Sequence, residues 1–473
     1  MNLDQFLIMR HELLLIGVVL LLLIAEVFSK SEKKHFMIPF AIILFLLYTI
    51  VGFLPAKTGV LFGGMYQTSE LVILFKNILN VAVFIILLQS ASWLRKDINH
   101  ERISEFYIIL LSSLIGMNFM ISAGDFLMFY LGLETATIPL TALAAFDKYK
   151  NKSAEAGIKF ILSSALSSGI LLFGLSILYG TTGSIYFTEV AEKLVASPLL
   201  VLGFIFFVSG MSFKISLVPF HFWTADVYEG APVNVTSFLS VVSKGAAAFI
   251  FMVILFTVFK SLSNMWGDVL YLLSILTMTI GNLFAMRQKN MKRFLAFSSI
   301  AQAGFILLGI MGASELGMTS VVYFVLVYVF SNLAAFGVVS VISDKTGLES
   351  MDDYNGMYRT NPKLSLIMML ALFSLAGIPP VAGFFGKFFL FTSAASKGYY
   401  WLVLIAVLNA TISLYYYLLV VKAMFINKND TPIAKFKSTF TDRLALIICV
   451  AGIFAIGFAS PIYELIRSLS FGF

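Results

Sequence analysis

The stretch PVNVTSFLSVVSKGAAAFIFMVILFTVF, residues 232–259, decides the fold class of this chain. About 20 apolar residues are enough to cross a bilayer as an α-helix, and this run is longer than that. It carries a single charged residue, Lys244, close to its middle. The run therefore predicts a membrane-spanning helix that holds a lysine at mid-depth.

Similar apolar runs recur along the whole chain. In order, the fourteen predicted spans are 13–28, 36–54, 71–93, 104–121, 125–146, 156–179, 198–222, 232–259, 267–286, 294–312, 317–342, 363–394, 399–426 and 443–467. Continuous runs exclude a transmembrane β-barrel, whose strands alternate in hydrophobicity over about ten residues. We predict an all-α polytopic membrane protein.

The composition indicates the same class. Of the 473 residues, 60% are hydrophobic and 12% are charged, and the mean hydropathy is +0.95. A soluble domain is roughly a quarter charged. The chain therefore lacks the charge to cover the surfaces of soluble domains, and we expect lipid to replace most of its surface water.

Residues that usually hold metals and redox groups are scarce. The single cysteine, Cys449, cannot form an internal disulfide, ligate an iron–sulfur cluster or build a Cys-rich zinc site. The four histidines are scattered along the chain, at His11, His35, His100 and His221. Neither a GxGxxG nor a P-loop pattern occurs. We therefore expect no cofactor on this chain, and any coupled redox chemistry on other subunits.

The positions of the basic residues predict the orientation. Of the 32 Lys and Arg residues, 22 lie in or beside the loops after odd-numbered spans, and only six lie in the other loops and at the termini. Positive charge on membrane proteins gathers in cytoplasmic loops. The excess of positive charge therefore predicts membrane topology rather than nucleic-acid binding, with both termini on the outer side.

Four lysines remain inside the predicted spans. Lys214, Lys244 and Lys387 lie deep within theirs, and the carboxylate of Glu134 lies near the middle of another. A charge at the bilayer centre costs on the order of 3 kcal/mol even on a lenient scale, so these residues need partners or internal water. Lys76 lies only about two turns from a helix end, and we expect it to reach the interface.

Polar residues share helix faces with these charges, at spacings of three and four. The predicted path consists of Tyr130, Thr137 and Thr141 beside Glu134, Ser237 and Ser240 beside Lys244, Ser298, Ser299 and Gln302 on the tenth span, Tyr328, Ser331 and Asn332 on the eleventh, and His221. The alternative is ordinary hydrogen bonding between helices by small polar residues.

A buried lysine suits proton transfer. Burial lowers the pKa of a lysine, and a nearby carboxylate raises it again, so a partner that moves can load and unload the proton. Glu134 is the candidate carboxylate. The sequence leaves open which lysine it contacts.

Prolines interrupt two of the long spans. Pro219 follows Lys214, and Pro379 and Pro380 precede Lys387. Irregular backbone at membrane depth occurs where it is buried or lines a cavity, and transporters use paired broken helices as ion sites. The breaks lie five spans apart, in helices 7 and 12, which predicts two inverted repeats of five helices.

The predicted domains follow from this repeat. Residues 1–103 hold helices 1–3, residues 104–260 hold the first repeat of helices 4–8, residues 261–427 hold the second repeat of helices 9–13, and residues 428–473 hold helix 14.

The motifs resemble a known family over essentially the whole chain. They are LGLETATIP around Glu134, HFWTADVYEGAP from His221, VTSFLSVVSKGAA, KRFLAFSSIAQAG and GIPPVAGFFGKF. Together they resemble the antiporter-like subunits of respiratory complex I, the proton-pumping NADH–quinone oxidoreductase. The segment DVYEGAP usually reads differently in the M-type and L-type subunits and in sodium/proton antiporters, so the resemblance is to the N-type branch.

That resemblance implies roles for particular residues. Glu134 and Lys214 would form a charge pair, Lys244 would be the central relay lysine, and Lys387 would serve in the second broken helix. The family also places a functional lysine at the position of Lys159, which otherwise suits a surface pair with Glu155. Gln302 stands where many relatives have a histidine, so a proton step there would need water.

The resemblance also implies partners. The chain would act in a proton-translocating oxidoreductase as a non-redox subunit of the bacterial inner membrane, beside an M-type subunit and small K-, J- and A-type subunits. NADH, FMN, iron–sulfur clusters and quinone would bind to other subunits of this respiratory-chain complex. Two alternatives remain from the sequence: a subunit of a multi-subunit cation/proton antiporter, and a membrane scaffold without an ion path.

Overall fold

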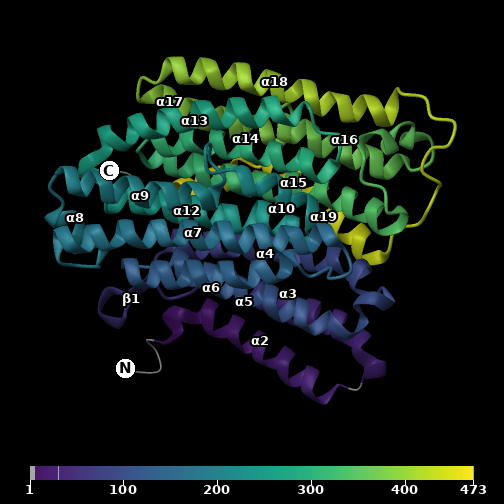
Figure 1. The fold of residues 1–473 in the computed structure, drawn as a ribbon, viewed down its shortest axis with the longest axis horizontal. Helices are drawn as coiled ribbons and strands as arrows, with labels where there is room; N and C mark the ends of the chain where they lie inside the picture. The colour runs from purple at the N-terminus through teal and green to yellow at the C-terminus, as the bar shows by residue number, and fades with distance from the viewer. Residues whose placement is uncertain (1–5, 30, 472–473) are drawn as a thin grey trace.

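The chain forms a bundle of long helices that run side by side, as the sequence predicts (Figure 1). The computed structural model describes residues 6–29 and 31–471. Within those residues, thirteen helices are long and apolar enough to cross a membrane, and one further span is divided into α16 and α17. The prediction of an all-α membrane protein is confirmed.

The helices of the spans are α2 (Arg10–Phe28), α3 (Met37–Gly52), α4 (Glu70–Leu94), α5 (Ile103–Ile121), α6 (Phe126–Ala144), α7 (Asn151–Thr182), α9 (Pro198–Ile215), α11 (Val233–Phe238) with α12 (Lys244–Thr257), α13 (Ser263–Ala285), α14 (Met291–Met311), α15 (Glu315–Thr346), α16 (Pro362–Ala376) with α17 (Ala382–Ser396), α18 (Tyr400–Phe425) and α19 (Phe440–Phe458). Shorter helices are α8 (Phe187–Lys193), α10 (Phe222–Gly230) and α20 (Ser460–Leu469). Turns of 3₁₀ helix cover Leu7–Met9, Ser31–Phe36, Phe62–Gly64, Asp97–Arg102, Lys260–Leu262, Met351–Tyr354 and Met357–Arg359.

A small hairpin follows α3 and was not expected from the sequence. Its strands, β1 (Gly59–Leu61) and β2 (Tyr66–Thr68), are antiparallel, with Gly59 opposite Thr68. We call the end of the bundle that carries this hairpin and α8 the N-terminal face, and the end that carries residues 145–150 and 426–439 the opposite face. Both ends of the described chain lie at the N-terminal face, on the left in Figure 1.

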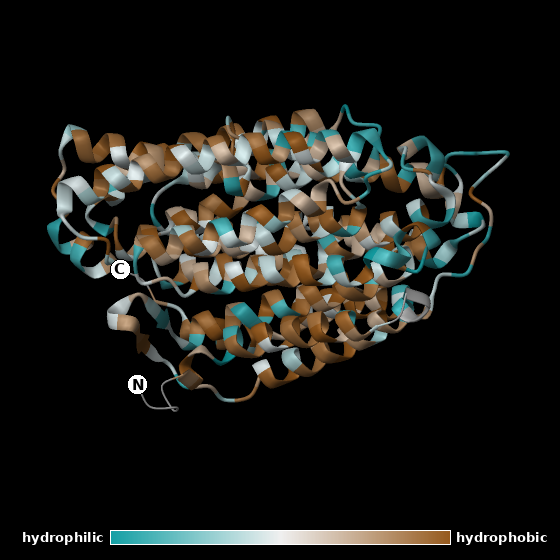
Figure 2. Ribbon diagram, turned by 60° about the horizontal axis from the view of Figure 1, so that its bottom comes forward, coloured by the Kyte–Doolittle hydropathy of each residue, from teal (hydrophilic) through white to brown (hydrophobic). Residues whose placement is uncertain are grey.

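The distribution of hydrophobic residues suits lipid. Figure 2 shows hydrophobic residues along the lengths of the helices, whereas hydrophilic residues gather at the two ends of the bundle. In each of α2, α7, α18 and α19, only 33% of the residues in the most apolar 18-residue segment are buried. These helices therefore present apolar side chains outward.

The centre of the bundle is built from α14, α11–α12 and α15. Of the residues in the most apolar 18-residue segment, 100% are buried in α14, 94% in Val233–Thr257 and 89% in α15. Polar groups on these helices have almost no access to lipid or to the headgroup region. They therefore have to find partners inside the protein.

Close packing of α5 on α6 depends on two glycines. A Cβ added at Gly116 would lie 2.6 Å from the carbonyl carbon of Thr135 and 2.8 Å from the carbonyl oxygen of Gly132. Small residues let membrane helices approach in this way. Because Gly132 precedes Glu134 by two residues, this contact also fixes the position of that carboxylate.

We expect Gly116→Val to destabilise the protein. Overpacking usually costs about 1–3 kcal/mol, and here the obstacle is backbone, which cannot turn away as a side chain can. The measurement is the unfolding temperature of the protein purified from membranes. The control is Gly169→Val on α7, where a Cβ meets nothing within 4 Å. Equal unfolding temperatures for the two variants would contradict this account of the α5–α6 contact.

The two predicted breaks are present, and they share one local geometry. The first helix, α9, ends at Ile215; Ser216 has a left-handed φ of 69°, and the amide of Leu217 donates to the carbonyl of Ser212 at 2.8 Å. The second, α16, ends before Gly377 with a φ of 89°, and the amide of Ile378 donates to Phe373 at 3.0 Å. Both helices thus end four residues before Pro219 and Pro380, in a C-terminal Schellman arrangement.

Three predicted spans differ from the structure in continuity. The spans 198–222 and 363–394 are not single helices, because the chain turns after α9 and after α16. The last predicted span, 443–467, is also divided: α19 ends at Phe458 and α20 begins at Ser460. The first two divisions are the predicted breaks, whereas the division of the last span was not predicted, because the residues around it are themselves apolar.

The order of elements agrees with two five-span units. In the first, α5 packs on α6 and α7 packs on α9, the helix before the break. In the second, α13 packs on α14, and α15 packs on both α16 and α17 around its break. The limits of the domains stay a prediction.

Candidate functional site

Lys244 is the central buried charge. It is the first residue of α12 and follows a π-helical turn, Leu239–Ser243, a feature often found at functional sites. Its ammonium donates to the Ser299 hydroxyl at 2.6 Å and lies 5.9 Å from the centre of the Tyr228 ring. No carboxylate among the described residues forms a salt bridge with it. Hydroxyls and a ring face hold this cation, and no fixed counter-ion does.

A group of hydrogen bonds surrounds Lys244 and joins three helices. The Ser240 hydroxyl lies 3.3 Å from that of Ser299 and 3.0 Å from that of Tyr328. It also accepts a hydrogen bond of 2.6 Å from the amide of Asn332. The π turn, α14 and α15 thus contribute to one buried group, as the polar stripes predict.

A second group begins one residue away, at Ser298. Its hydroxyl lies 2.5 Å from the hydroxyl of Tyr417 on α18, and the Gln302 amide donates to that tyrosine at 3.3 Å. Gln302 also donates to the carbonyl of Leu375 at 3.1 Å. The tyrosine was not among the residues expected from the sequence, although Asn409 and Ser413 precede it on the same face of α18. Polar contacts thus extend from the centre to the end of α16.

Lys387 lies at that same end of α16. Its ammonium donates to the carbonyl of Ala376 at 2.9 Å and lies 4.6 Å from the centre of the Phe305 ring. The acceptor is a carbonyl left free where the helix stops, so the break supplies the binding site of the lysine. Ser374 reaches the hydroxyl of Ser331 at 2.7 Å, and a void of about 10 Å³, room for about one water, lies beside both serines.

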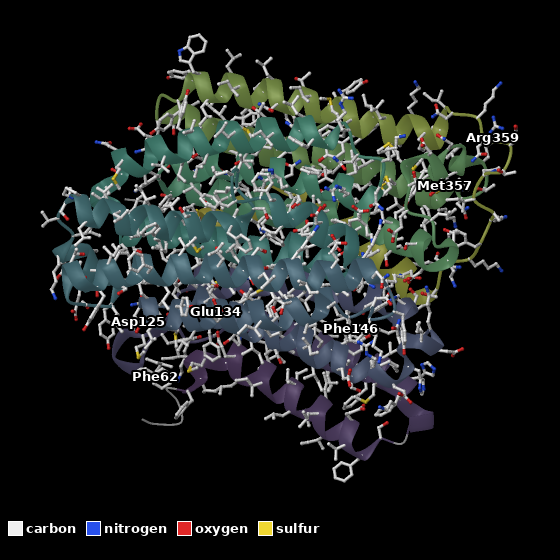
Figure 3. The ribbon with its side chains drawn as sticks, viewed as in Figure 1. Phe62, Asp125, Glu134, Phe146, Met357 and Arg359 are labelled. Atoms are coloured by element: carbon white, nitrogen blue, oxygen red, sulfur yellow. The ribbon has the colours of Figure 1, made fainter. Side chains whose placement is uncertain are left out.

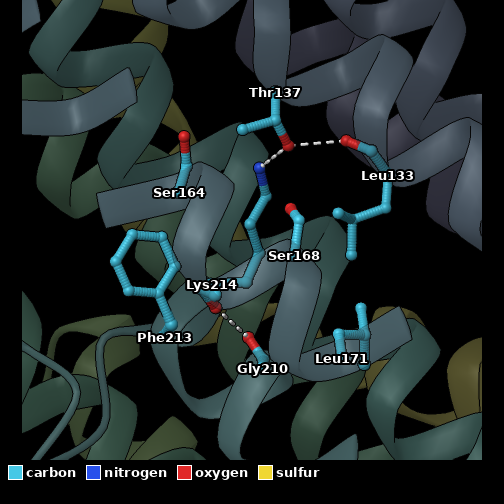
Figure 4. Close-up of a pocket in the computed structure, with 9 residues that line it drawn as sticks. Leu133, Thr137, Ser164, Ser168, Leu171, Gly210, Phe213 and Lys214 are labelled. Carbon is cyan, nitrogen blue, oxygen red and sulfur yellow. Dashed lines mark hydrogen bonds between the residues drawn. The ribbon is translucent and has the colours of Figure 1, made fainter. Parts of the chain in front are cut away.

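Lys214 lies in the last turn of α9 and is buried. It donates to the hydroxyl of Thr137, which in turn donates to the carbonyl of Leu133 at 2.5 Å (Figure 4). A void of about 10 Å³ lies beside the lysine and is lined by serines of α7, among them Ser164 and Ser168. The site has space for about one water.

Glu134 lies one turn from Thr137 on α6. It is half-buried, and Figure 3 shows it between Asp125 at the start of α6 and Phe146 just beyond its end. It forms no ion pair with Lys214 within 4 Å among the described residues, although the two are close enough to interact electrostatically. One oxygen of Glu134 is buried without a hydrogen-bond partner. Glu134 and Lys214 therefore lie near each other, but the described residues do not show the expected ion pair between them.

Lys159 lies apart from the buried groups. Its side chain is 43% exposed and pairs with Glu155 at 2.7 Å and with Asp226 at 2.6 Å. Arg293 also binds Asp226, at 2.6 Å. Burial would raise the pKa of Asp226, but the hydrogen bonds from Lys159 and Arg293 outweigh it and hold that pKa below its usual value. Lys159 thus belongs to a charge network at the opposite face.

Three other expected path residues do not join the chain of contacts. His221 is buried at the turn between α9 and α10, and its Nδ1 has no partner in the described part of the protein. Tyr130 is half-buried near Glu134 on α6. Thr141, farther along the same face, donates to the carbonyl of Ile138 at 2.7 Å. This bond lies within α6, so it neither extends the path nor links two helices.

A polar cavity opens toward the Lys244 group from the opposite face. It has a volume of about 270 Å³ and is lined by charged and amide side chains, including Lys292, Glu349 and Asn234. Lys292 pairs with Glu349 at 3.1 Å, and Ser340 donates to Asn234 at 3.2 Å. From Asn234, the stripe of Ser237 and Ser240 leads along the same span to Lys244. From the sequence alone, Lys292 was counted only among the basic residues in or beside a loop.

The prediction for Lys76 was wrong. Its side chain is 1% exposed and pairs at 2.5 Å with Glu12, which is fully buried. Glu12 was missed because the predicted first span begins at residue 13. The hydroxyl of Tyr66 contacts both side chains.

Metal-ligating residues stay dispersed in the folded chain. Across residues 6–29 and 31–471, no group of three or more His, Cys, Asp and Glu side chains is placed to hold a metal ion. Cys449 is buried within α19. The chemistry that this arrangement supports is proton transfer between lysines, hydroxyls and amides.

Comparisons with known proteins agree with this geometry. A family model described as NADH:quinone oxidoreductase/Mrp antiporter, TM, matches residues 123–413. The chain is 50% identical to NADH-quinone oxidoreductase subunit N of Phocaeicola vulgatus, over 98% of this chain and 99% of the relative. It is 52% identical to the subunit of that name from Azobacteroides pseudotrichonymphae, over 100% and 99%. It is also similar to a chain of respiratory complex I from Thermus thermophilus with bound aureothin, with a TM-score of 0.81 and 27% identity over 98% of this chain and 100% of that one.

Proposed function

Because the chain belongs to the family of NADH-quinone oxidoreductase subunit N, we propose that its buried lysines and Glu134 form the path by which this membrane-arm subunit moves protons. The observation that carries the proposal is the run of buried polar contacts between Lys244 and Lys387. It passes through neighbouring residues of α14 and ends where α16 is broken.

Each part of the run has a role that its chemistry allows. Lys244 has no fixed carboxylate partner, so its charge depends on the hydroxyls around it and on the fields of more distant groups. Ser, Thr and Tyr hydroxyls both donate and accept, which lets a proton pass along them. Water beside Gln302 passes the proton on to the Lys387 amine. The free carbonyl of Ala376 then accepts a hydrogen bond from the resulting ammonium.

Control of the path begins at Lys214. As Glu134 approaches or withdraws, the electrostatic field at Lys214 changes, and the lysine takes up or releases a proton through Thr137. The energy comes from quinone reduction on other subunits, transmitted as a change of charge or hydration along the membrane arm. The other membrane-arm subunits are the chain's partners in the complex.

The cofactors lie on other subunits, and this chain has a fixed orientation in the membrane. NADH, FMN, iron–sulfur clusters and quinone bind to other subunits, in keeping with the scarcity of ligating residues here. The protein lies in the bacterial inner membrane with both termini on the outer side, as its basic loops indicate. Lys159 then lies on the cytoplasmic side, where its network with Asp226 and Arg293 surrounds the start of α14.

We expect Lys214→Met and Glu134→Gln each to lower proton translocation per quinone reduced while the complex still assembles. Both changes remove a charge and nearly keep the side-chain volume. The measurement is proton uptake by inverted vesicles during quinone reduction, with assembly followed on native gels. Lys193→Met is the control, because Lys193 forms an exposed pair with Glu189 at 3.6 Å on α8.

Two outcomes would count against the relay. Full coupled turnover in both variants would favour a scaffold without an ion path. Translocation that requires sodium in the medium would favour the alternative of a cation/proton antiporter, an activity that the family description also covers.

A further inference from the structure

The ion pair of Glu12 and Lys76 forms a second buried charged centre, separate from the path through Lys244. Glu12 is the third residue of α2, and Lys76 lies about two turns into α4, so both are near the N-terminal face. Their side chains are 0% and 1% exposed, although α2 is otherwise a largely exposed helix. Two charges have been taken out of reach of the solvent at the edge of the bundle.

Tyr66 covers the ion pair on the side of the hairpin. Its hydroxyl donates to Glu12 at 2.9 Å and lies 3.2 Å from the ammonium of Lys76. It is carried by strand β2 of the hairpin. The hairpin is held to the turn between α5 and α6 by two backbone bonds, from Gln67 to Ser122 at 2.8 Å and from Gly124 to Met65 at 2.7 Å.

A cavity that is open to the surface at Thr58 and Glu70 lies on the other side of this hairpin. It has a volume of about 570 Å³ and is lined by residues of β1, β2 and the start of α4, together with Ile121 and Ala123. Gln67 and Thr68 of β2 line the cavity, whereas the hydroxyl of their neighbour Tyr66 reaches Glu12. Tyr66 therefore stands between a water-accessible cavity and the buried ion pair.

Unpartnered polar groups lie on the inner side of the pair. Asn80, one turn beyond Lys76 on α4, is fully buried, and neither end of its amide has a partner among the described residues. The same holds for the amide oxygen of Asn118 on α5. Buried amides and hydroxyls require partners, from protein or from water. The space between α4 and α5 is therefore suited to hold water that continues inward from Lys76.

The other charged and titratable neighbours are already engaged. His11 bonds to Asn77 at 3.1 Å, and Arg10 binds the carbonyls of Pro55 at 2.9 Å and Leu54 at 2.7 Å. Tyr48, on α3, lies 3.5 Å from the amide of Asn118. Lys76 and Glu12 thus have each other as their only charged hydrogen-bond partners among the described residues.

We propose that Glu12, Lys76 and Tyr66 form a further proton-exchange site, which connects the N-terminal face with the interior between α4 and α5. A proton from the cavity reaches the Glu12 carboxylate by way of the Tyr66 hydroxyl and neutralises it. Lys76, now without its counter-charge, releases a proton toward Asn80. The proton on Glu12 then passes to the Lys76 amine and restores the pair, so one proton enters, one leaves, and the net charge returns to zero.

This site rests on the proposed function, because its protons are those that the complex moves. A purely structural pair would act differently. Removing one partner of a buried pair leaves an uncompensated charge, whereas replacing both by apolar residues of similar size is often neutral for stability. The double variant Glu12→Leu/Lys76→Met therefore separates the two roles where single variants fail to assemble.

The experiment uses the intact complex in inverted vesicles and compares proton uptake per quinone reduced. We expect the double variant to assemble normally and to lose at least about tenfold in proton translocation, because loss of a positioned proton-transfer group typically costs on the order of 10² or more. Tyr66→Phe keeps the ring and the ion pair and is expected to slow translocation in the same direction. The control is Glu26→Leu/Lys34→Met, a partly exposed pair at 2.8 Å at the other end of α2.

The outcomes distinguish failure of this site from failure of the proposed function. Normal translocation in the assembled double variant, or in Tyr66→Phe, overturns this site even when Lys214→Met abolishes pumping. Normal translocation in both the double variant and Lys214→Met instead overturns the proposed function on which the site rests. Equal losses in the double variant and in the Glu26/Lys34 control would show a general effect of disturbing α2, and would also overturn the site.

Discussion

Replacing Lys244 by methionine is expected to abolish most proton-coupled turnover while leaving assembly intact. The side chain lies at the centre of the described contacts, and its ammonium is held by the Ser299 hydroxyl without a fixed counter-ion. Methionine fills nearly the same volume and removes only the charge and the proton. Loss of a positioned proton-transfer group costs on the order of 10²-fold or more.

The arginine variant distinguishes a proton carrier from a fixed charge. Arginine keeps the positive charge but does not release its proton in proteins. Lys244→Arg is therefore expected to be nearly as inactive as Lys244→Met in proton uptake by vesicles. Restored pumping in the arginine variant would show that charge alone matters. Lys397→Met, at the exposed end of α17, serves as the matched control and should leave turnover unchanged.

A second large effect is expected from Gly383→Ala in α17. An added Cβ would overlap the carbonyl oxygen of Ser374, so the two halves of the broken span cannot approach as they do now. The amide of Gly383 also donates to the Ser374 hydroxyl at 3.2 Å. Separation of the halves withdraws the Ala376 carbonyl from Lys387. We expect a loss of stability of about 3 kcal/mol or more, at or beyond the upper end of ordinary overpacking.

The measurements for Gly383→Ala are the amount of assembled complex and its coupled turnover. The control is Gly180→Ala on α7, where an added Cβ meets nothing within 4 Å and alanine is the better helix former. If Gly383→Ala matched that control in both measurements, the contact between α16 and α17 would not be what positions Lys387.

Much of the fold followed from the sequence because span length and hydropathy are local properties. A backbone in lipid has to satisfy its own hydrogen bonds, so each apolar run of sufficient length became a helix or, at two places, a broken helix. The breaks near Pro219 and Pro380 and the burial of Lys214, Lys244 and Lys387 were predicted on that basis and are confirmed. The resemblance to the antiporter-like subunits of complex I, carried by segments such as DVYEGAP, is confirmed as well.

The partners of the buried charges did not follow from the sequence. Tyr417 joins Ser298 across more than one hundred residues, and Lys76 joins Glu12 across 64. Hydropathy placed Lys76 near an interface by depth alone, but the hairpin and α2 cover it. The position of Glu134 was predicted well in depth, whereas its lack of an ion pair with Lys214 was not.

The sequence by itself determined that this chain spans the membrane many times, that two of its spans are broken near prolines, and that Lys214, Lys244 and Lys387 are buried. Only the tertiary structure decided which side chains meet, because contact depends on how each helix is rotated about its axis and which neighbour it faces. That rotation is set by packing, as at Gly116 and Gly383, between residues far apart in the chain. Depth is a property of one helix, and a proton path is a property of several helices packed together.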